Sequence, residues 1–182
     1  MLSDDPIGAG DRWIPEDEYD FIRARVPILC VDLIPLSEDE PPKIGLIERD
    51  IYGGGTGWCI VGGAVLRNEP LIVALQRHLH ATLGHAVTLN LETLSFLDVI
   101  EYFAEPDIGE FYDPRKHSVS LVHFGRCHGP IQVTPRGEAN DFRWYKPEES
   151  MTLKFGYGQG KVVERYLRIP ASGHKHKDPD SF

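Results

Sequence analysis

The stretch from Trp58 to Gly84 most narrows the folds open to this chain, because its pattern changes from strand-like to helical across a glycine pair. Residues 58–61 form a short apolar run, and Gly62-Gly63 follows as a turn. Residues 70–83 then show helical spacing of apolar side chains, starting near Pro70 and ending before Gly84. The apolar stripe of this helix consists of Leu71, Ala74, Leu75, Leu79 and Leu83. The segment predicts a strand, a tight turn and an amphipathic helix.

The rest of the chain alternates between strand and helix patterns. We predict strands at residues 28–36, 43–48, 118–124, 131–133 and 142–145, and extended segments at 87–97 and 100–103. Helices are predicted to begin at Pro15 and Pro147 and to cover residues 160–169, while residues 104–116 form a polar loop. The fold class is α/β, an α/β/α sandwich around a mixed sheet. We expect one domain over residues 13–170, with a flexible leader at 1–12 and a flexible polar tail at 171–182.

Composition excludes several classes of function. The chain has 182 residues, 41% hydrophobic and 26% charged, and a formal net charge of −9. An acidic chain lacks the basic surface that nucleic-acid binding needs, and no apolar run is long enough to span a membrane. We expect a cytoplasmic protein whose three cysteines, Cys30, Cys59 and Cys127, are buried as small apolar side chains.

Residues 63–84 resemble the Nudix box, which reads G-x5-E-x7-R-E-U-x-E-E-x-G-U with U an apolar residue. Five positions match in register, and they are Gly63, Glu69, Arg77, Leu79 and Gly84. The resemblance implies a Nudix-like fold in which these five residues are structural, with Glu69 and Arg77 pairing to fasten the loop to the helix.

The glutamates that hold magnesium in the family are missing. Their positions are occupied by His78, Ala81 and Thr82, and neither imidazole nor hydroxyl replaces the hard carboxylate oxygens that Mg²⁺ prefers. The box is therefore degenerate, and standard hydrolysis with two or three magnesium ions is not expected. A Mg²⁺ or Mn²⁺ ion would be held weakly, or there would be none.

A narrower resemblance over roughly residues 13–150 is to the GDP-mannose mannosyl hydrolase branch of the superfamily, which also has an incomplete box. The matching segments are Val31-Asp32-Leu33, Glu48-Arg49, residues 60–65 and residues 138–144. It implies that Asp32 and Arg49 contact the substrate, and that Glu138 with a carbonyl near Gly63 holds any metal. Three positions depart from the branch: Ala64 replaces an arginine, Thr82 a glutamate, and Ala139 the histidine that acts as general base.

Several polar residues have open assignments. Asp32 lies in an apolar strand and needs a partner, either Arg49 in a structural ion pair or a ligand facing both. His78 occupies a former glutamate position and either faces the cleft and contacts substrate or is an ordinary solvated histidine. His117 and His123 fall on one side of their strand, so His123 is a second candidate for substrate binding, or for a transition-metal site with Glu138.

Three functions fit these residues. The first is an atypical Nudix-fold hydrolase of a nucleoside-diphosphate-linked compound such as a nucleotide sugar. The second is a catalytically inactive Nudix-like module that binds a nucleotide or another ligand, or regulates. The third is an interaction domain. In each case we expect a homodimer, with a small molecule as the ligand in the first two.

Overall fold

The computed structural model describes residues 14–133 and 137–170; the predicted leader and tail lie outside these ranges. The first half contains α2 (Glu16–Arg23), β1 (Ile28–Leu36), β2 (Ile44–Asp50), β3 (Thr56–Cys59), β4 (Val61–Ala64), α3 (Leu71–Leu83) and β5 (Thr88–Leu89). The second half contains the 3-10 helix η1 (Leu91–Thr93), β6 (Ser95–Phe103), β7 (Phe111–Tyr112), β8 (Ser118–His128), β9 (Asp141–Tyr145), α4 (Pro147–Ser150) and α5 (Gly160–Leu167). Within the described residues, no helix is long and apolar enough to cross a membrane.

The strands form one mixed sheet with β1 and β8 at its centre. The strand order is β3-β2-β1-β8-β6-β7, and β4, β9 and β5 pair with β1, β2 and β8 respectively. β1 and β8 run parallel with nine pairs in register, from Ile28↔Ser118 to Leu36↔Arg126. β1 is apolar and almost continuously buried, as a strand covered on both faces should be.

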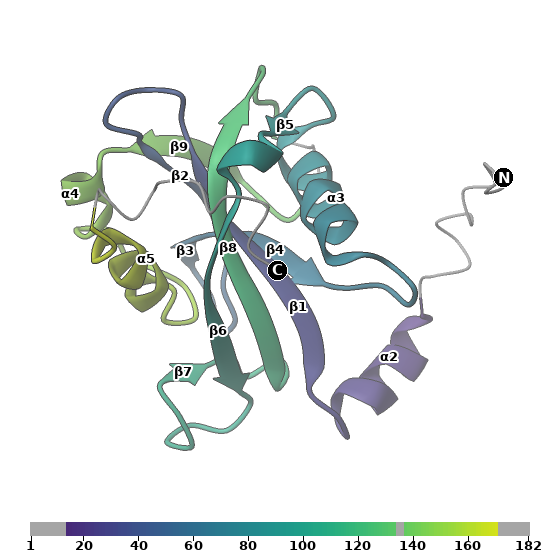
Figure 1. Ribbon diagram of the computed structural model, residues 1–182. Helices are drawn as coiled ribbons and strands as arrows, with labels where there is room; N and C mark the ends of the chain where they lie inside the picture. The colour runs from purple at the N-terminus through teal and green to yellow at the C-terminus, as the bar shows by residue number, and fades with distance from the viewer. Residues whose placement is uncertain (1–13, 134–136, 171–182) are drawn as a thin grey trace, which may run out of the picture.

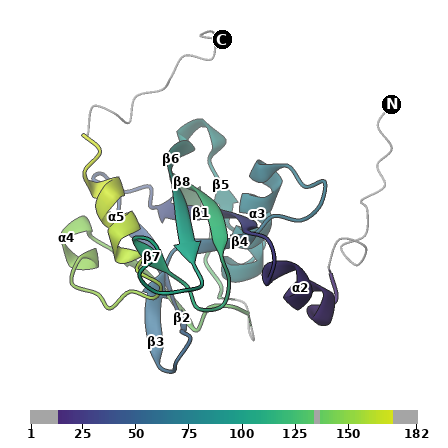
Figure 2. The same cartoon turned by 90° about the horizontal axis from the view of Figure 1, so that it is seen from below.

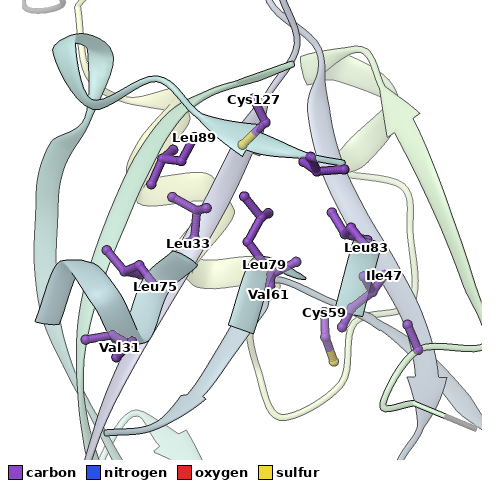
Figure 3. Packing of buried hydrophobic residues seen from close by; sticks show 13 residues of the cluster. Val31, Leu33, Ile47, Cys59, Val61, Leu75, Leu79, Leu83, Leu89 and Cys127 are labelled. Carbon is purple, nitrogen blue, oxygen red and sulfur yellow. The ribbon is translucent and has the colours of Figure 1, made fainter. Parts of the chain in front are cut away.

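Helices cover both faces of the sheet, with α3 on one side and α5 on the other (Figures 1 and 2). Side chains alternate between the faces along each strand. On the α3 face, Leu33, Val61 and Leu79 belong to a cluster of buried apolar side chains (Figure 3). On the α5 face, Ile34, Val122 and Tyr166 belong to a second cluster. The predicted mixed α/β sandwich is confirmed.

The helix α3 forms where the apolar stripe predicted it. Pro70 is its N-cap, and Leu75, Leu79 and Leu83 turn their side chains to the sheet and are almost completely buried. Gly84 ends the helix with a positive φ of 93°, a conformation that a side chain would disfavour, and its N–H donates to the carbonyl of His80 at 3.0 Å.

Several predicted segments differ from the structure. Gly62 and Gly63 do not form a turn: they lie in β4 and pair with Asp32 and Val31 of β1, and the loop to α3 begins after Ala64. The predicted polar loop at 104–116 contains the short strand β7. Residues 87–97 are not one extended run, because the side chain of Asn90 accepts a hydrogen bond from the N–H of Glu92 and begins the helix η1 between β5 and β6. Residues 131–133 are not a strand either. The N–H of Gln132 instead donates to the carbonyl of Leu83 at the end of α3, at 2.9 Å, and this loop covers the α3 cluster.

Candidate functional site

The loop that leads from β4 into α3 is fastened by a buried ion pair. The carboxylate of Glu69 accepts hydrogen bonds from Nε and Nη2 of Arg77 at 2.7 and 2.8 Å, and from the N–H of Leu66 at 2.9 Å. Arg77 also donates to the carbonyl of Ala64 at 2.9 Å. These bonds to Arg77 and Leu66 hold the pKa of Glu69 below its ordinary value. The pair joins the first residues of the loop to the second turn of the helix.

The three positions that differ from the Nudix box do not offer ligands for a hard cation. Nε2 of His78 lies 3.0 Å from the carbonyl of Ala64, and its ring is so close to Gly63 that a Cβ there would lie 2.6 Å from Cε1 of His78. Thr82 is buried and Ala81 has no donor. Residues 14–133 and 137–170 contain no group of three or more His, Cys, Asp or Glu side chains placed to hold a metal ion. The donor set therefore does not fit Mg²⁺.

A polar pocket lies on the α5 face of the sheet, beside Gly62 and Gly63 of β4. Its enclosed volume is about 90 Å³, less than the roughly 300–1,000 Å³ of pockets that enclose a drug-sized ligand. It can enclose one small polar group of a ligand, and the rest would extend outside. The lining residues come from β1, β2, β4, β6, β8 and four connecting segments. They are Cys30, Asp32, Arg49, Ile60, Gly62, Gly63, Tyr102, Asp113, Arg115, Lys116, Ser118, Ser120, Glu138, Tyr157 and Gln159.

Asp32 is one of two buried carboxylates of this pocket, the other being Asp113. Its Oδ2 accepts a hydrogen bond of 2.6 Å from the hydroxyl of Ser120 on the neighbouring strand β8. Burial raises the pKa of Asp32 to about 6, against the opposing effects of Ser120, Lys116 and Arg49. Gly62 faces Asp32 across the β1–β4 pair, and a Cβ at Gly62 would lie 2.1 Å from Oδ1 of Asp32. The glycine therefore makes room for the carboxylate.

Arg49 reaches the pocket from β2 and pairs with Glu138, which lies just before β9. Its Nη1 donates to Oε1 of Glu138, while its buried Nε has no hydrogen-bond partner among the described residues. Burial and the nearby charge of Arg115 lower the pKa of Arg49. One prediction paired Asp32 with Arg49 in an ion pair. In the structure, Asp32 accepts a hydrogen bond from the hydroxyl of Ser120, and Arg49 forms a salt bridge with Glu138. Glu138, predicted as a metal ligand, is thus engaged by a cation.

The loop between β7 and β8 adds two more cations. Asp113 is buried and accepts hydrogen bonds from Nε and Nη2 of Arg115 at 2.9 and 2.8 Å, and from the N–H of Arg115 at 3.0 Å. The guanidinium of Arg115 lies over the ring of Tyr157, 4.1 Å from its centroid. Nζ of the next residue, Lys116, lies 3.7 Å from Sγ of Cys30. Three cations, one from β2 and two from the loop between β7 and β8, thus line one pocket.

The structure brings only some of the predicted site residues together. Asp32, Arg49, Gly63 and Glu138 all line the pocket. His78 lies beside Gly63 on the α3 side and does not line the pocket. His123 is farther removed: it alternates with Ser120 and Val122 along β8, so it points to the opposite face of the sheet. There its Nδ1 lies 3.0 Å from the carbonyl of Leu121 and its ring contacts Phe96. The assignment of His123 to this pocket was wrong.

Sequence reasoning missed the residues that come from loops. Asp113, Arg115 and Lys116 lie in the segment that was predicted only as a polar loop, and Tyr157 and Gln159 precede α5. Their side chains show no periodicity or motif. The loop residues before β8 meet Asp32 because β1 and β8 are neighbours, while Gln159 is placed by a hydrogen bond from the N–H of Ile60 to its side chain. No pattern in the sequence could have identified them.

Comparison with known proteins is consistent with the fold. A family model described as "Domain of unknown function (DUF4916)" matches residues 9–169. The curated protein "Low-salt glycan biosynthesis protein Agl8" from Haloferax volcanii is 33% identical over 104 residues, which are 57% of this chain. The match spans 62% of the length of that relative.

Solved structures of Nudix and MutT proteins have the same architecture. A possible asymmetric diadenosine tetraphosphate hydrolase from Jonesia denitrificans is 27% identical, with a TM-score of 0.68 over 80% of this chain and 98% of that one. The NUDIX domain of Shewanella oneidensis NrtR, solved in complex with ADP ribose, is 16% identical with a TM-score of 0.62, over 85% of this chain and 97% of that one. At 16% identity, the similarity to the NrtR domain shows the fold alone. Together they support the Nudix fold that residues 63–84 predicted.

Proposed function

The chain belongs to the family described as Domain of unknown function (DUF4916), and we propose that it is an atypical Nudix-fold hydrolase of a nucleoside-diphosphate-linked compound such as a nucleotide sugar. One observation carries the proposal: a single pocket beside Gly62 and Gly63 of β4 combines a buried carboxylate, Asp32, with cations that include Arg49. A nucleotide sugar has the complementary groups, because its diphosphate is anionic and its hydroxyls can donate to a carboxylate.

The relatives are compatible with this substrate class. The archaeal protein that shares 33% identity over part of the chain is named for glycan biosynthesis, and the NrtR domain was solved with ADP ribose, which is itself a nucleoside-diphosphate-linked sugar. The resemblance to the GDP-mannose mannosyl hydrolase branch points the same way. We therefore assign the diphosphate to the cationic side of the pocket and the hydrolysed bond to its Asp32 side.

Asp32 is the residue we assign to proton transfer. Asp32 and Asp113 are both buried carboxylates of the pocket, but Asp113 forms a salt bridge with Arg115. Among the described residues, Asp32 instead accepts one hydrogen bond, at Oδ2, from the hydroxyl of Ser120. A carboxylate with a pKa of about 6 is ionised at neutral pH and is a better proton acceptor than an ordinary aspartate. In the proposed step, a water oxygen attacks the sugar carbon that carries the diphosphate, and a proton of that water passes to Asp32. The bond between this carbon and the phosphate oxygen breaks, and its electrons stay on the oxygen of the nucleoside diphosphate that leaves. No step passes through a metal, because the donor set does not fit one.

Turnover measurements test this function. The protein would be incubated with GDP-mannose, UDP-glucose, ADP-ribose and diadenosine tetraphosphate, in EDTA and in Mg²⁺ or Mn²⁺, and products would be separated by chromatography and assigned by ³¹P NMR. Hydrolysis of at least one compound, lost in Asp32→Asn and Arg49→Met, is expected. Asp39→Asn and Arg143→Met are matched controls, because both residues lie on the exposed surface. Equal rates in all four variants would reject the assigned site.

A binding module is the second candidate function. The observation that favours it is the replacement of the box carboxylates by His78, Ala81 and Thr82, together with the lack of a metal-ligand group in the described part of the chain. Such a protein would bind the same ligands through the same cations without turning them over. Calorimetric titration that shows saturable binding, with no product after prolonged incubation, would favour this function over hydrolysis.

A further inference from the structure

Among the described residues, Lys116 differs from the other two cations of the pocket in forming no salt bridge with a carboxylate, although its charge lowers the pKa of the nearby Asp32. Arg49 is paired with Glu138 and Arg115 with Asp113. The contact found for the ammonium of Lys116 among the described side chains is the thiol of Cys30, at 3.7 Å, which is a weak acceptor. A lysine ammonium has three N–H donors, and the thiol accepts at most one of them. The remaining donors can bind an anion.

The backbone holds Lys116 in place. The N–H of Lys116 donates to the carbonyl of Asp113 at 3.2 Å, and the side chain of Asp113 accepts from the N–H of Arg115 at 3.0 Å. Asp113 is almost completely buried, so the turn is anchored in the protein interior. The two consecutive cations are therefore presented from a fixed turn, and little ordering would be needed when a ligand binds.

The cations of the pocket repel one another in the absence of a ligand. Arg115 lowers the pKa of Arg49, which means that the positive charge of Arg49 is disfavoured by that of its neighbour. The guanidinium carbons of Arg49 and Arg115 lie 5.8 and 4.1 Å from the centroid of the same Tyr157 ring. An anion between these groups would relieve the repulsion, and it would also give the buried Nε of Arg49 the acceptor it lacks.

We propose that Lys116, supported by Arg115 and Arg49, neutralises a ligand diphosphate in the role that a divalent cation has in the family, so that phosphate binding here is independent of metal. We call these three side chains the phosphate clamp. The proposal rests on the proposed function for its ligand class, but binding by the clamp can be measured alone with inorganic pyrophosphate. Lysine binds phosphate as a point charge, while the planar guanidinium groups orient it. The small enclosed volume suits one phosphate group.

Isothermal titration of pyrophosphate into the full-length protein in EDTA tests the clamp. We expect saturable binding that Lys116→Gln weakens by about tenfold or more, the cost of losing one charge-assisted hydrogen bond. Lys116→Arg should retain most of the affinity. Lys43→Gln is the matched control, because Lys43 pairs with Asp39 on the surface, and its effect should stay within about twofold. Thermal unfolding of each variant confirms that it is folded.

The outcomes separate this proposal from the proposed function. Pyrophosphate binding that requires Mg²⁺, or equal affinity for Lys116→Gln and Lys43→Gln, would overturn the clamp even if nucleotide sugars were hydrolysed. Metal-independent pyrophosphate binding that depends on Lys116, without turnover of any nucleotide sugar, would uphold the clamp and contradict the hydrolase. Titration with ADP and with inorganic phosphate then distinguishes a nucleotide ligand from a free phosphate ligand.

Discussion

Glu69 and Arg77 form a buried ion pair with two hydrogen bonds, of 2.7 and 2.8 Å, between the loop before α3 and the helix itself. Arg77 also holds the carbonyl of Ala64 at the end of β4. Strand, loop and helix are thus joined through one guanidinium, and the position of the end of β4, which carries Gly62 and Gly63 beside the pocket, depends on it.

Glu69→Gln should destabilise the protein, because the guanidinium of Arg77 would lose its charged partner. The expected cost is about 2–3 kcal/mol, slightly less than for a fully buried pair because Arg77 is partly exposed. The pKa of Glu69 is lowered in the folded protein from an ordinary 4.5, so its contribution to stability is present above pH 4.5 and is lost as the pH falls below that value. Urea denaturation of both proteins at pH 7 and pH 3.5 measures this. If the difference in the free energy of unfolding between parent and variant is as large at pH 3.5 as at pH 7, the ion pair is not its cause.

Asp32→Asn should have the opposite effect on stability. The pKa of Asp32 rises from 3.8 to about 6 on folding. Below pH 3.8 the group is protonated in both the folded and the unfolded chain, so it does not lower stability. As the pH rises from 3.8 to about 6, the unfolded chain ionises first and the free energy of unfolding falls. At pH 8 the variant should be more stable than the parent, by a margin on the order of 3 kcal/mol. Chemical denaturation at pH 5 and pH 8 tests this, and the same variant should lose turnover. A variant less stable than the parent at pH 8 would show that the carboxylate is not disfavoured by burial.

Gly62→Ala should disturb the pocket at its closest contact. The added methyl group would lie 2.1 Å from Oδ1 of Asp32 and 2.3 Å from the carbonyl of Val31, so β1 or β4 must move. We expect a loss of about 1–3 kcal/mol in the free energy of unfolding, and weaker pyrophosphate binding. Gly54→Asn is the control for replacing a glycine without a steric clash, because nothing lies within 4 Å of a Cβ there. Its φ of 99° adds backbone strain, so the readout that separates the two variants is pyrophosphate binding, which Gly54→Asn should leave unchanged. Similar losses of pyrophosphate binding in both variants would mean that the clash with Asp32 is not the cause.

Leu79→Ala tests the contribution of the box helix to the core. Leu79 is completely buried against β1 and β4 in the α3 cluster. Truncation should cost about 2–5 kcal/mol, through lost burial and the cavity left behind. Leu71, on the same helix but partly exposed, provides the control, since Leu71→Ala should cost far less. Comparable losses from the two substitutions would show that the helix packs differently.

Local patterns predicted the fold well but the site incompletely. The apolar stripe through Leu79 and the end of α3 at Gly84 are encoded within one short segment, so periodicity and glycine position were sufficient for the helix. They were not sufficient for Gly62 and Gly63, which continue the strand β4 instead of forming a turn, because their pairing with β1 depends on a strand that is distant in sequence. Asp32 was recognisable because a charge inside an apolar strand is unusual. Arg115 and Lys116 had no such contrast with their surroundings, since cations are ordinary in a polar loop.

The error over His123 has a different cause. Period-two alternation correctly placed His117 and His123 on one side of the strand, but it could not tell which face of the sheet that side becomes. The face was decided by the partners of β8: Ser120, not His123, lies beside Asp32. Likewise, Glu138 was recognised as a polar residue near the site, but its partner Arg49 lies on another strand, and a resemblance to metal-binding relatives could not show that pairing.

The parallel pairing of β1 with β8 has a consequence for how the chain folds. Asp32 and Ser120 are 88 residues apart in sequence, and their strands can align only after everything between them has been looped out. Contacts of this kind slow folding, because the entropy of closing the loop is lost before the contact is gained. A chain that ends before residue 118 during synthesis therefore has no partner for the pocket edge of β1. The pocket is a late product of folding, and it cannot be recovered from either half of the chain alone.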